Sequence, residues 1–201
     1  MAGRTTFHLI RHASYGLLGQ VLAGRSSGHS LNTVGLAEAE RLADGLARRP
    51  IVAVISSPLE RAQETAAPIA TRLGIEVQID PDLNEIDFGA WTGRRFDVLH
   101  AAPEWQAFNV LRSATPIPGG ETMLAAQARA VAAILGWRAR WPQHELVVVS
   151  HGDVVKALLA YFLGVPIDLF RRLEIAPASR SIVSLGSVDV RVNGVNLPPS
   201  A

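Results

Sequence analysis

The segment Leu146-Val147-Val148-Val149-Ser150-His151-Gly152 sets four consecutive apolar residues directly before two polar side chains and a glycine. An apolar run without alternating polar residues is typical of a strand buried on both faces of a parallel sheet. The same pattern recurs at residues 51–55, and a shorter apolar run occupies residues 7–10. Residues 75–79 alternate apolar and polar side chains, which predicts a strand with one more exposed face. These four runs predict the strands of one sheet.

Helical periodicity fills the intervals between these strands. Residues 33–49 and 122–141 each predict a helix with one apolar face. We expect the first face to hold Leu36, Ala39, Leu42, Ala43 and Leu46, and the second to hold Leu124, Ala128, Val131 and Leu135.

Two more helices and a final pair of strands complete the predicted order. Ser57-Pro58 has the residue types of an N-cap and a first helical position, and Pro68 should kink or shorten the helix that follows. Residues 152–163 predict another helix, and residues 180–192 predict two strands around a glycine. Strands that alternate with helices predict an α/β fold. We expect a three-layer α/β/α sandwich with a mostly parallel central sheet, in a single domain over residues 1–201.

Composition excludes several classes of function. The chain has 201 residues, of which 48% are hydrophobic, and it carries 19 basic against 18 acidic residues. This balance argues against nucleic acid as a partner. Lys156 is the one lysine, and the absence of cysteine excludes disulfides and thiolate chemistry. We find no apolar segment long enough for a membrane span and no signal-peptide pattern near Met1, and we therefore expect a cytoplasmic protein.

Polar residues that suit phosphoryl chemistry follow the predicted strands. Arg11-His12 follows the first, Ser150-His151-Gly152 follows the last parallel strand, and Arg61 and Glu85 come after the two others. In open α/β sheets, ligands bind beyond the carboxyl ends of the strands. Arginines bind phosphoryl oxygens, an imidazole can attack phosphorus, and a carboxyl group can protonate the leaving oxygen. The predicted edge therefore collects the groups that such chemistry needs.

The motifs at these positions resemble those of the histidine phosphatase superfamily, also called the phosphoglycerate-mutase-like family. The similar segments occur in the family's order and extend over most of the chain. They are Leu9-Ile10-Arg11-His12-Ala13, residues 56–66 (Ser-Ser-Pro-Leu-Glu-Arg-Ala-Gln-Glu-Thr-Ala), residues 85–93 (Glu-Ile-Asp-Phe-Gly-Ala-Trp-Thr-Gly), Pro118-Gly119-Gly120-Glu121-Thr122 and Val149-Ser150-His151-Gly152.

The resemblance implies a role for each matching residue. His12 would be the nucleophile that forms a phosphohistidine, and Glu85 would be the general acid and then the general base. Arg11, Arg61 and His151 would hold the phosphoryl oxygens, with His151 protonated. Gly152 is a further candidate for substrate contact. Arg25 could contact the phosphate or the substrate, or it could have a structural role in its loop. The family's chemistry needs no metal and no organic cofactor, and a small phosphorylated substrate is expected.

Two positions depart from the family pattern. Ala13 stands where a glycine is usual, and Leu18 stands where an asparagine is common, which would remove one donor to the phosphate. His29 lies in the same region, and both substrate contact and a structural role remain open for it.

The resemblance also bears on whether the protein is a phosphatase or a mutase. The family's mutases carry an arginine pair and a lysine in an insertion after the acid loop. Here Arg112 stands alone between residues 106 and 118, and Arg94-Arg95 has a different spacing. We therefore expect a phosphatase, with a mutase or a non-catalytic phospho-ligand binding module as alternatives. Residues 94–120 are expected to form a cap-like insertion, in which Trp105 and Phe108 would favour substrates with a bulky apolar part.

Other motifs are weaker. Residues 24–28 fit the G-x-S-x-G pattern of serine hydrolases but lack a convincing strand before them and helix after them. Asp80-Pro81-Asp82 follows a strand, as in aspartate-nucleophile phosphatases, but those enzymes need Mg²⁺ and further carboxylates. No P-loop sequence is present. The strand at residues 75–79 is a candidate surface for a homodimer.

Overall fold

A single mixed sheet forms the centre of the protein, and its strand order is β3-β2-β4-β1-β5-β6. The computed structural model describes residues 3–199. Its strands are β1 (Thr5–Arg11), β2 (Ile51–Ser56), β3 (Val77–Ile79), β4 (Glu145–Ser150), β5 (Arg180–Leu185) and β6 (Val190–Leu197). The first four are mutually parallel, β5 runs antiparallel to β1, and β6 runs antiparallel to β5. The predicted mostly parallel sheet is confirmed.

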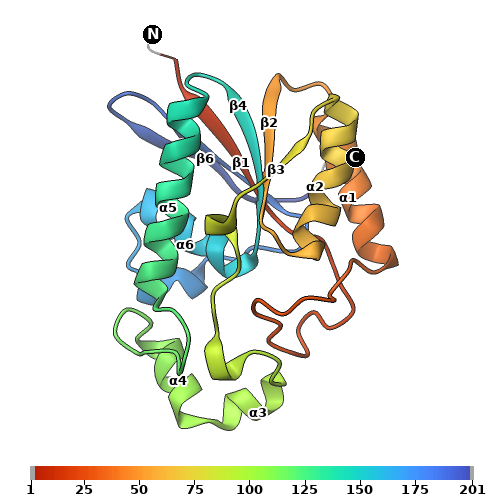
Figure 1. Ribbon diagram of the computed structural model, residues 1–201. Helices are drawn as coiled ribbons and strands as arrows, with labels where there is room; N and C mark the ends of the chain where they lie inside the picture. The colour runs from red at the N-terminus through yellow and green to blue at the C-terminus, as the bar shows by residue number, and fades with distance from the viewer. Residues whose placement is uncertain (1–2, 200–201) are drawn as a thin grey trace.

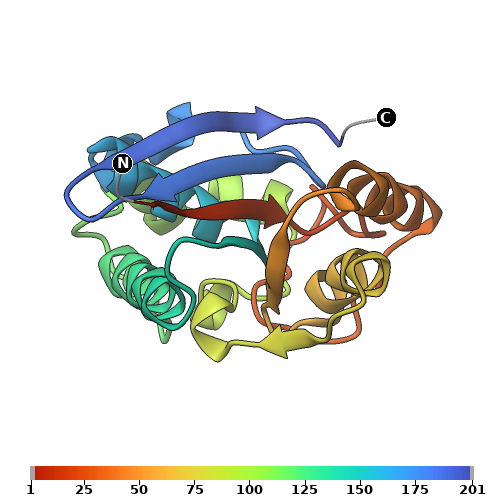
Figure 2. The same ribbon diagram turned by 90° about the horizontal axis from the view of Figure 1, so that it is seen from above.

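Helices cover both faces of this sheet, which confirms the three-layer arrangement (Figures 1 and 2). One face carries α1 (Thr33–Leu46) and α2 (Glu60–Leu73), and the other carries α5 (Met123–Arg140) and α6 (Gly152–Leu163). Two short helices, α3 (Phe96–Ala101) and α4 (Pro103–Val110), lie beyond the end of the sheet in Figure 1. Short 3₁₀ turns occur at η1 (Pro81–Leu83), η2 (Gly89–Trp91) and η3 (Ile167–Arg172).

Both predicted apolar helix faces need correction. In α1, Leu36 is exposed and Gly35 is buried instead, because the helix approaches the backbone at Ser14 too closely for a side chain. In α5, Leu124 and Leu135 are exposed, Ala128 is exposed as well, and only Val131 of the predicted face is buried. The buried face combines three alanines with larger apolar residues, and it consists of Met123, Ala126, Ala130, Val131, Ala133 and Ile134.

The start of α2 also differs from the prediction. The helix begins at Glu60, with Leu59 as its N-cap, rather than at Ser57-Pro58. The Ser57 hydroxyl lies 2.7 Å from Nε2 of a histidine described below, and it accepts the N–H of Leu59 at 3.4 Å. Pro68 does not shorten the helix, since α2 continues past it to Leu73.

The edge strands and helix α6 complete the comparison with the predicted elements. The strand predicted at 75–79 is shorter, and β3 lies at one edge of the sheet while β6 lies at the other. The helix predicted at 152–163 is confirmed, and it ends at Gly164 in the left-handed conformation. Within residues 3–199, none of the helices combines the length and apolar character that crossing a membrane requires.

Candidate active site

Pairing between strand ends brings the two motif histidines together. The backbone N–H of His12 donates to the carbonyl of Ser150 at 2.8 Å, and the N–H of Ser57 donates to the carbonyl of Val149 at 2.9 Å. These bonds continue the parallel β1–β4–β2 pairing one residue beyond the strands. The rings of His12 and His151 consequently lie with their centroids 5.3 Å apart.

His12 is held in one tautomer. Its Nδ1 lies 2.8 Å from the carbonyl oxygen of Ala13, and because a carbonyl only accepts, Nδ1 carries the proton. Nε2 therefore keeps the lone pair. Burial lowers the pKa of His12 to about 3, and the charges of Arg61 and Arg11 act in the same direction. The imidazole is neutral at physiological pH, as a nucleophile must be.

The alanine that replaces the usual glycine fits beside this histidine. Ala13 is fully buried, and its N–H donates to Oγ1 of Thr65 at 2.9 Å. The Thr65 hydroxyl in turn donates to the carbonyl of Arg61 at 2.7 Å. The departure at Ala13 thus leaves the backbone behind His12 tied to helix α2.

Two arginines beside His12 have donors without partners. Arg61 is only 1% exposed, and its Nη2 donates to the carbonyl of Gly24 while Nε and Nη1 have no partner among the described residues. Arg11 donates through Nη1 to the carbonyl of Ile175, and its Nε is likewise buried without a partner. Gly152 lies close to this arginine, since a Cβ at that position would lie 3.1 Å from Nε of Arg11.

His151 contributes a further unpartnered nitrogen. Its Nε2 lies 2.7 Å from Oγ of Ser57, and its Nδ1 is buried, lies 3.9 Å from Oε2 of Glu85 and has no hydrogen-bond partner. Burial, together with the neighbouring His12 and Arg61, holds the pKa of His151 well below its usual value. The expectation of a protonated His151 is therefore wrong for the site without a ligand. The negative charge of a bound anion would raise its pKa.

Glu85 faces these nitrogens from the loop after β3. Its side chain is 14% exposed, and its Oε1 accepts the N–H of Ile86 at 2.9 Å. Burial raises the pKa of Glu85 to about 7, and the negative charge of Asp153 adds to the shift. A carboxyl group with this pKa can hold and release a proton near neutral pH.

Arg25 has the structural one of the two roles left open for it. It is absent from the pocket lining, and its Nε donates to the backbone carbonyl of Glu85 at 2.8 Å. Its Nη2 donates to Glu121, which also accepts the N–H of Asp87. Arg25 therefore holds the acid loop rather than lining the pocket. His29 also lies outside the pocket lining, with its Nε2 2.9 Å from Oγ of Ser26.

Glu121 and Arg129 complete the support of the acid loop, and sequence reasoning assigned them no role. Arg129 donates to the backbone carbonyls of Asp82 and Asn84, and it forms two hydrogen bonds to the Glu121 carboxylate. Glu121 belongs to the recognised segment 118–122, which was the available signal. Arg129 belongs to no motif.

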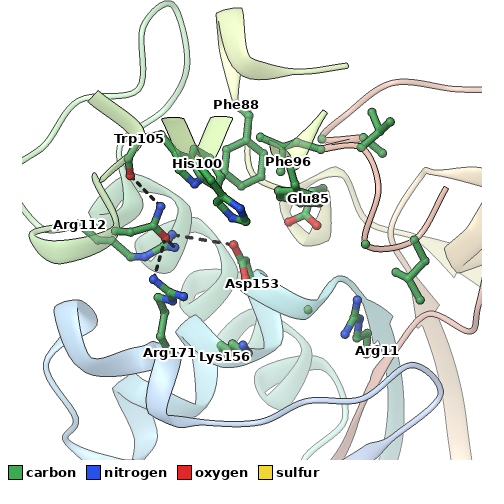
Figure 3. Close-up of a pocket in the computed structure, with 18 of the residues that line it drawn as sticks. Arg11, Glu85, Phe88, Phe96, His100, Trp105, Arg112, Asp153, Lys156 and Arg171 are labelled. Atoms are coloured by element: carbon green, nitrogen blue, oxygen red, sulfur yellow. Dashed lines mark hydrogen bonds and ion pairs between the residues drawn. The ribbon is translucent and has the colours of Figure 1, made fainter. Parts of the chain in front are cut away.

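A pocket of about 580 Å³ opens between the strand ends and the residues of α3 and α4 (Figure 3). His12, Arg11, Arg61, Glu85 and Gly152 line one end of it. Its other lining residues include aliphatic side chains such as Val21 and Val110 and the acidic Asp153, and also a set of aromatic and basic side chains: Phe88, Phe96, His100, Trp105, Arg112, Lys156 and Arg171. Leu18 lines it too, so an apolar side chain stands where an asparagine was common. Phe108 is fully buried and lies outside the lining, which corrects its expected role in direct contact.

The weaker motifs acquire structural explanations. Residues 24–28 lie in a loop whose Gly24 carbonyl accepts from Arg61. Asp80 caps η1 and accepts from the indole of Trp137 at 2.6 Å. Between residues 3 and 199, no group of three or more His, Cys, Asp or Glu is placed to hold a metal ion.

Comparison with known proteins agrees with this fold. Residues 7–198 match the model of the histidine phosphatase superfamily (branch 1), and the chain belongs to that family. An uncharacterized protein of Mycobacterium tuberculosis, Rv0525, is 41% identical over 82% of this chain and 81% of its own. A probable phosphoglycerate mutase, GpmB of Proteus mirabilis, is 33% identical over 93% and 88%. The solved mycobacterial glucosyl-3-phosphoglycerate phosphatase Rv2419c with VO₃ is 27% identical, has a TM-score of 0.86, and matches 98% of this chain and 100% of its own.

Proposed function

We propose that this protein hydrolyses phosphate monoesters through a phosphohistidine on His12, with Glu85 as general acid and then general base. One observation carries the proposal. Three buried guanidinium donors, Nε of Arg11 and Nε and Nη1 of Arg61, lack partners in the described chain, and Nδ1 of His151 beside His12 is also buried without a partner. Buried donors of this kind are normally satisfied, and a phosphoryl group offers the oxygens they need.

The first step follows from the tautomer of His12. Nε2 attacks phosphorus, the ester P–O bond breaks, and the leaving oxygen takes the proton of Glu85. The hydrogen bond from Nδ1 to the Ala13 carbonyl stabilises the positive imidazole of the phosphohistidine. Arg11 and Arg61 neutralise the charge on the phosphoryl oxygens during the transfer.

The second step uses the carboxylate of Glu85, which has lost its proton in the first step. Glu85 takes a proton from water, the water oxygen attacks phosphorus, and the P–N bond breaks. Orthophosphate leaves, His12 recovers its lone pair, and Glu85 is protonated again. A pKa of about 7 lets one group serve both steps near neutral pH.

A mutase is the second candidate, and the 33% identity to GpmB favours it. A mutase would return the phosphoryl group from His12 to an acceptor hydroxyl rather than to water. The lack of the mutases' arginine pair and lysine after the acid loop favours hydrolysis.

The test is orthophosphate release from phenyl phosphate in the presence of a strong chelator, with wild type and His12→Ala side by side. We expect release by the wild type only, which supports a metal-independent reaction through His12. Equal release by both proteins would contradict the proposal. Trapping of an acid-labile phosphohistidine without release would indicate the mutase, and ligand binding without either would indicate a binding module.

A further inference from the structure

The far end of the pocket, away from Arg11, holds three cationic side chains. They are Arg112, which follows α4, Lys156 in α6 and Arg171 in η3. Figure 3 shows Arg112 and Arg171 across the pocket from Arg11, with Asp153 and Lys156 between them. We propose that the substrate carries a second anionic group, a carboxylate or a second phosphate, which these three residues bind. The inference rests on the proposed phosphatase function and specifies its substrate class.

Arg112 is the strongest indication. It is only 5% exposed and is sandwiched between aromatic rings, with its guanidinium carbon 4.3 Å from the centroid of Phe108 and 4.5 Å from that of Phe170. Its Nη2 donates to Asn109, but its Nε is buried without a partner in the described residues. The carboxylate of Asp153 lies 3.9 Å from Nη1, at the limit of an ion pair. A buried guanidinium normally has closer and more complete pairing.

Lys156 and Arg171 add positive charge that the neighbouring residues do not neutralise. Lys156 is half-buried, and within residues 3–199 no hydrogen bond or ion pair engages its ammonium group; its Nζ lies 5.8 Å from the ring centroid of Phe170. Arg171 donates only to Asn109, at 3.3 Å. The nearby carboxylate of Asp168 is already used by the N–H and hydroxyl of Ser113. Asp153 is therefore the one acidic side chain that lines this end of the pocket.

Helix α6 sets the distance between the two ends. Gly152 begins the helix beside Arg11, and Lys156 follows four residues later, which is about 6 Å along the helix axis. A second anion therefore fits a few bonds from the phosphoryl group. The 580 Å³ pocket holds a small substrate of that kind.

The experiment compares esters that differ only in the second anion. One set is propyl phosphate, 3-phosphonooxypropanoate and propane-1,3-diyl bisphosphate, and the other is phenyl phosphate and 4-carboxyphenyl phosphate. We expect kcat/KM to be about tenfold or more higher for at least one doubly anionic ester than for its partner. The carboxylated and bisphosphorylated esters distinguish the two sources of the anion.

Variants assign the effect to these residues. Lys156→Met and Arg171→Met should each remove most of the preference for doubly anionic esters, and Lys156→Arg should retain it. Arg172→Met is the matched control, because Arg172 is exposed and lies outside the pocket lining. Equal kcat/KM within both ester sets, or a preference that Lys156→Met and Arg171→Met leave intact, would overturn the inference.

A binding measurement separates this inference from the proposed function. In His12→Ala, calorimetry should give tighter binding of a doubly anionic ester than of its singly charged partner, whether or not the wild type hydrolyses either. If the wild type releases no phosphate but this difference persists, the proposed function fails and the second anion site stands. If phosphate is released but the difference is absent, the anion site fails alone.

Discussion

The two ends of the pocket are built in different ways. One end of the pocket is called the phosphoryl end here, after the proposed function. There, Arg11 is the last residue of β1, and His12 and His151 directly follow the paired strands β1 and β4, so that backbone hydrogen bonds fix their positions. At the far end, Arg112, Lys156 and Arg171 come from a loop, a helix and a 3₁₀ turn that share no strand pairing. The first arrangement suits a reaction common to many substrates, and the second suits selection among them. Substitutions at the phosphoryl end should therefore affect all substrates, and substitutions at the far end should affect the choice among them.

The largest effect is expected for Arg61→Met at the phosphoryl end. Removing a guanidinium that faces the transferring group should lower kcat/KM by roughly a thousandfold for every ester, doubly anionic or not. Parallel kinetics on the ester sets above measure this. A loss confined to doubly anionic esters would contradict the division of the pocket into two ends.

The stability of Arg61→Met provides its control. Arg61 is buried with two unpartnered nitrogens, and replacing such a charge by an apolar side chain of similar length is often neutral or stabilising. We expect a thermal midpoint equal to or above that of the wild type. A large drop would mean that lost activity reflects unfolding.

The next effect is expected for Glu85→Gln, which removes the proposed proton donor. We predict a fall in kcat of about a hundredfold for alkyl esters, and a smaller fall for aryl esters, whose leaving groups need less protonation. Because the acid form of Glu85 is lost as pH rises through about 7, wild-type kcat/KM for alkyl esters should decline above that pH. The decline should be absent in Glu85→Gln.

Asp153→Asn sharpens the pH prediction. The negative charge of Asp153 helps to raise the pKa of Glu85, so its removal should lower that pKa. The alkaline decline in kcat/KM should then begin at lower pH than in the wild type. An unchanged profile would mean that Asp153 has no electrostatic influence on Glu85.

A tenfold effect is expected for Glu121→Gln, which acts on Glu85 through the acid loop. Glu121 accepts from Arg25, Arg129 and the N–H of Asp87, and loss of its charge should loosen the loop. We predict a fall in kcat of about tenfold for alkyl esters with KM little changed. Aryl esters should be affected less, as in Glu85→Gln. An equal loss on both ester types would indicate general damage instead.

The phosphoryl end could be predicted from the sequence for a physical reason. An apolar strand followed by a polar residue places that residue at a known edge of the sheet, and the motifs around His12, Arg61, Glu85 and His151 are short and local. The two roles left open for Arg25 could not be separated from the sequence because no local pattern encodes the direction in which a loop side chain points. Arg25 supports the acid loop from outside the pocket.

The far end could not be predicted because it depends on packing between distant elements. Lys156 and Arg171 meet Arg112 only when η3 packs beside α6, and none of the three lies in a motif. The predicted buried face of α5 was wrong for a related reason. Alanines occur on both sides of this helix, so periodicity alone did not distinguish its buried face from its exposed one. That Lys156 is the one lysine among nineteen basic residues was the available sign that it is unusual.

The smallest effect is expected for Trp105→Ala, which changes the wall between the two ends. Trp105 lines the pocket and packs against Trp91, with ring centroids 5.3 Å apart, and against Phe108 at 5.9 Å. Its removal enlarges the pocket beside the ester group without touching a charge at either end. We predict a change of about threefold to fivefold in the ratio of kcat/KM for phenyl phosphate to that for propyl phosphate. The preference for doubly anionic esters should be retained, because the residues proposed to bind the second anion remain.

Trp141→Ala, which removes a tryptophan outside the pocket lining, should leave the ratio unchanged. An unchanged ratio in Trp105→Ala would show that the aromatic wall does not select substrates, and that the far cationic residues act without it.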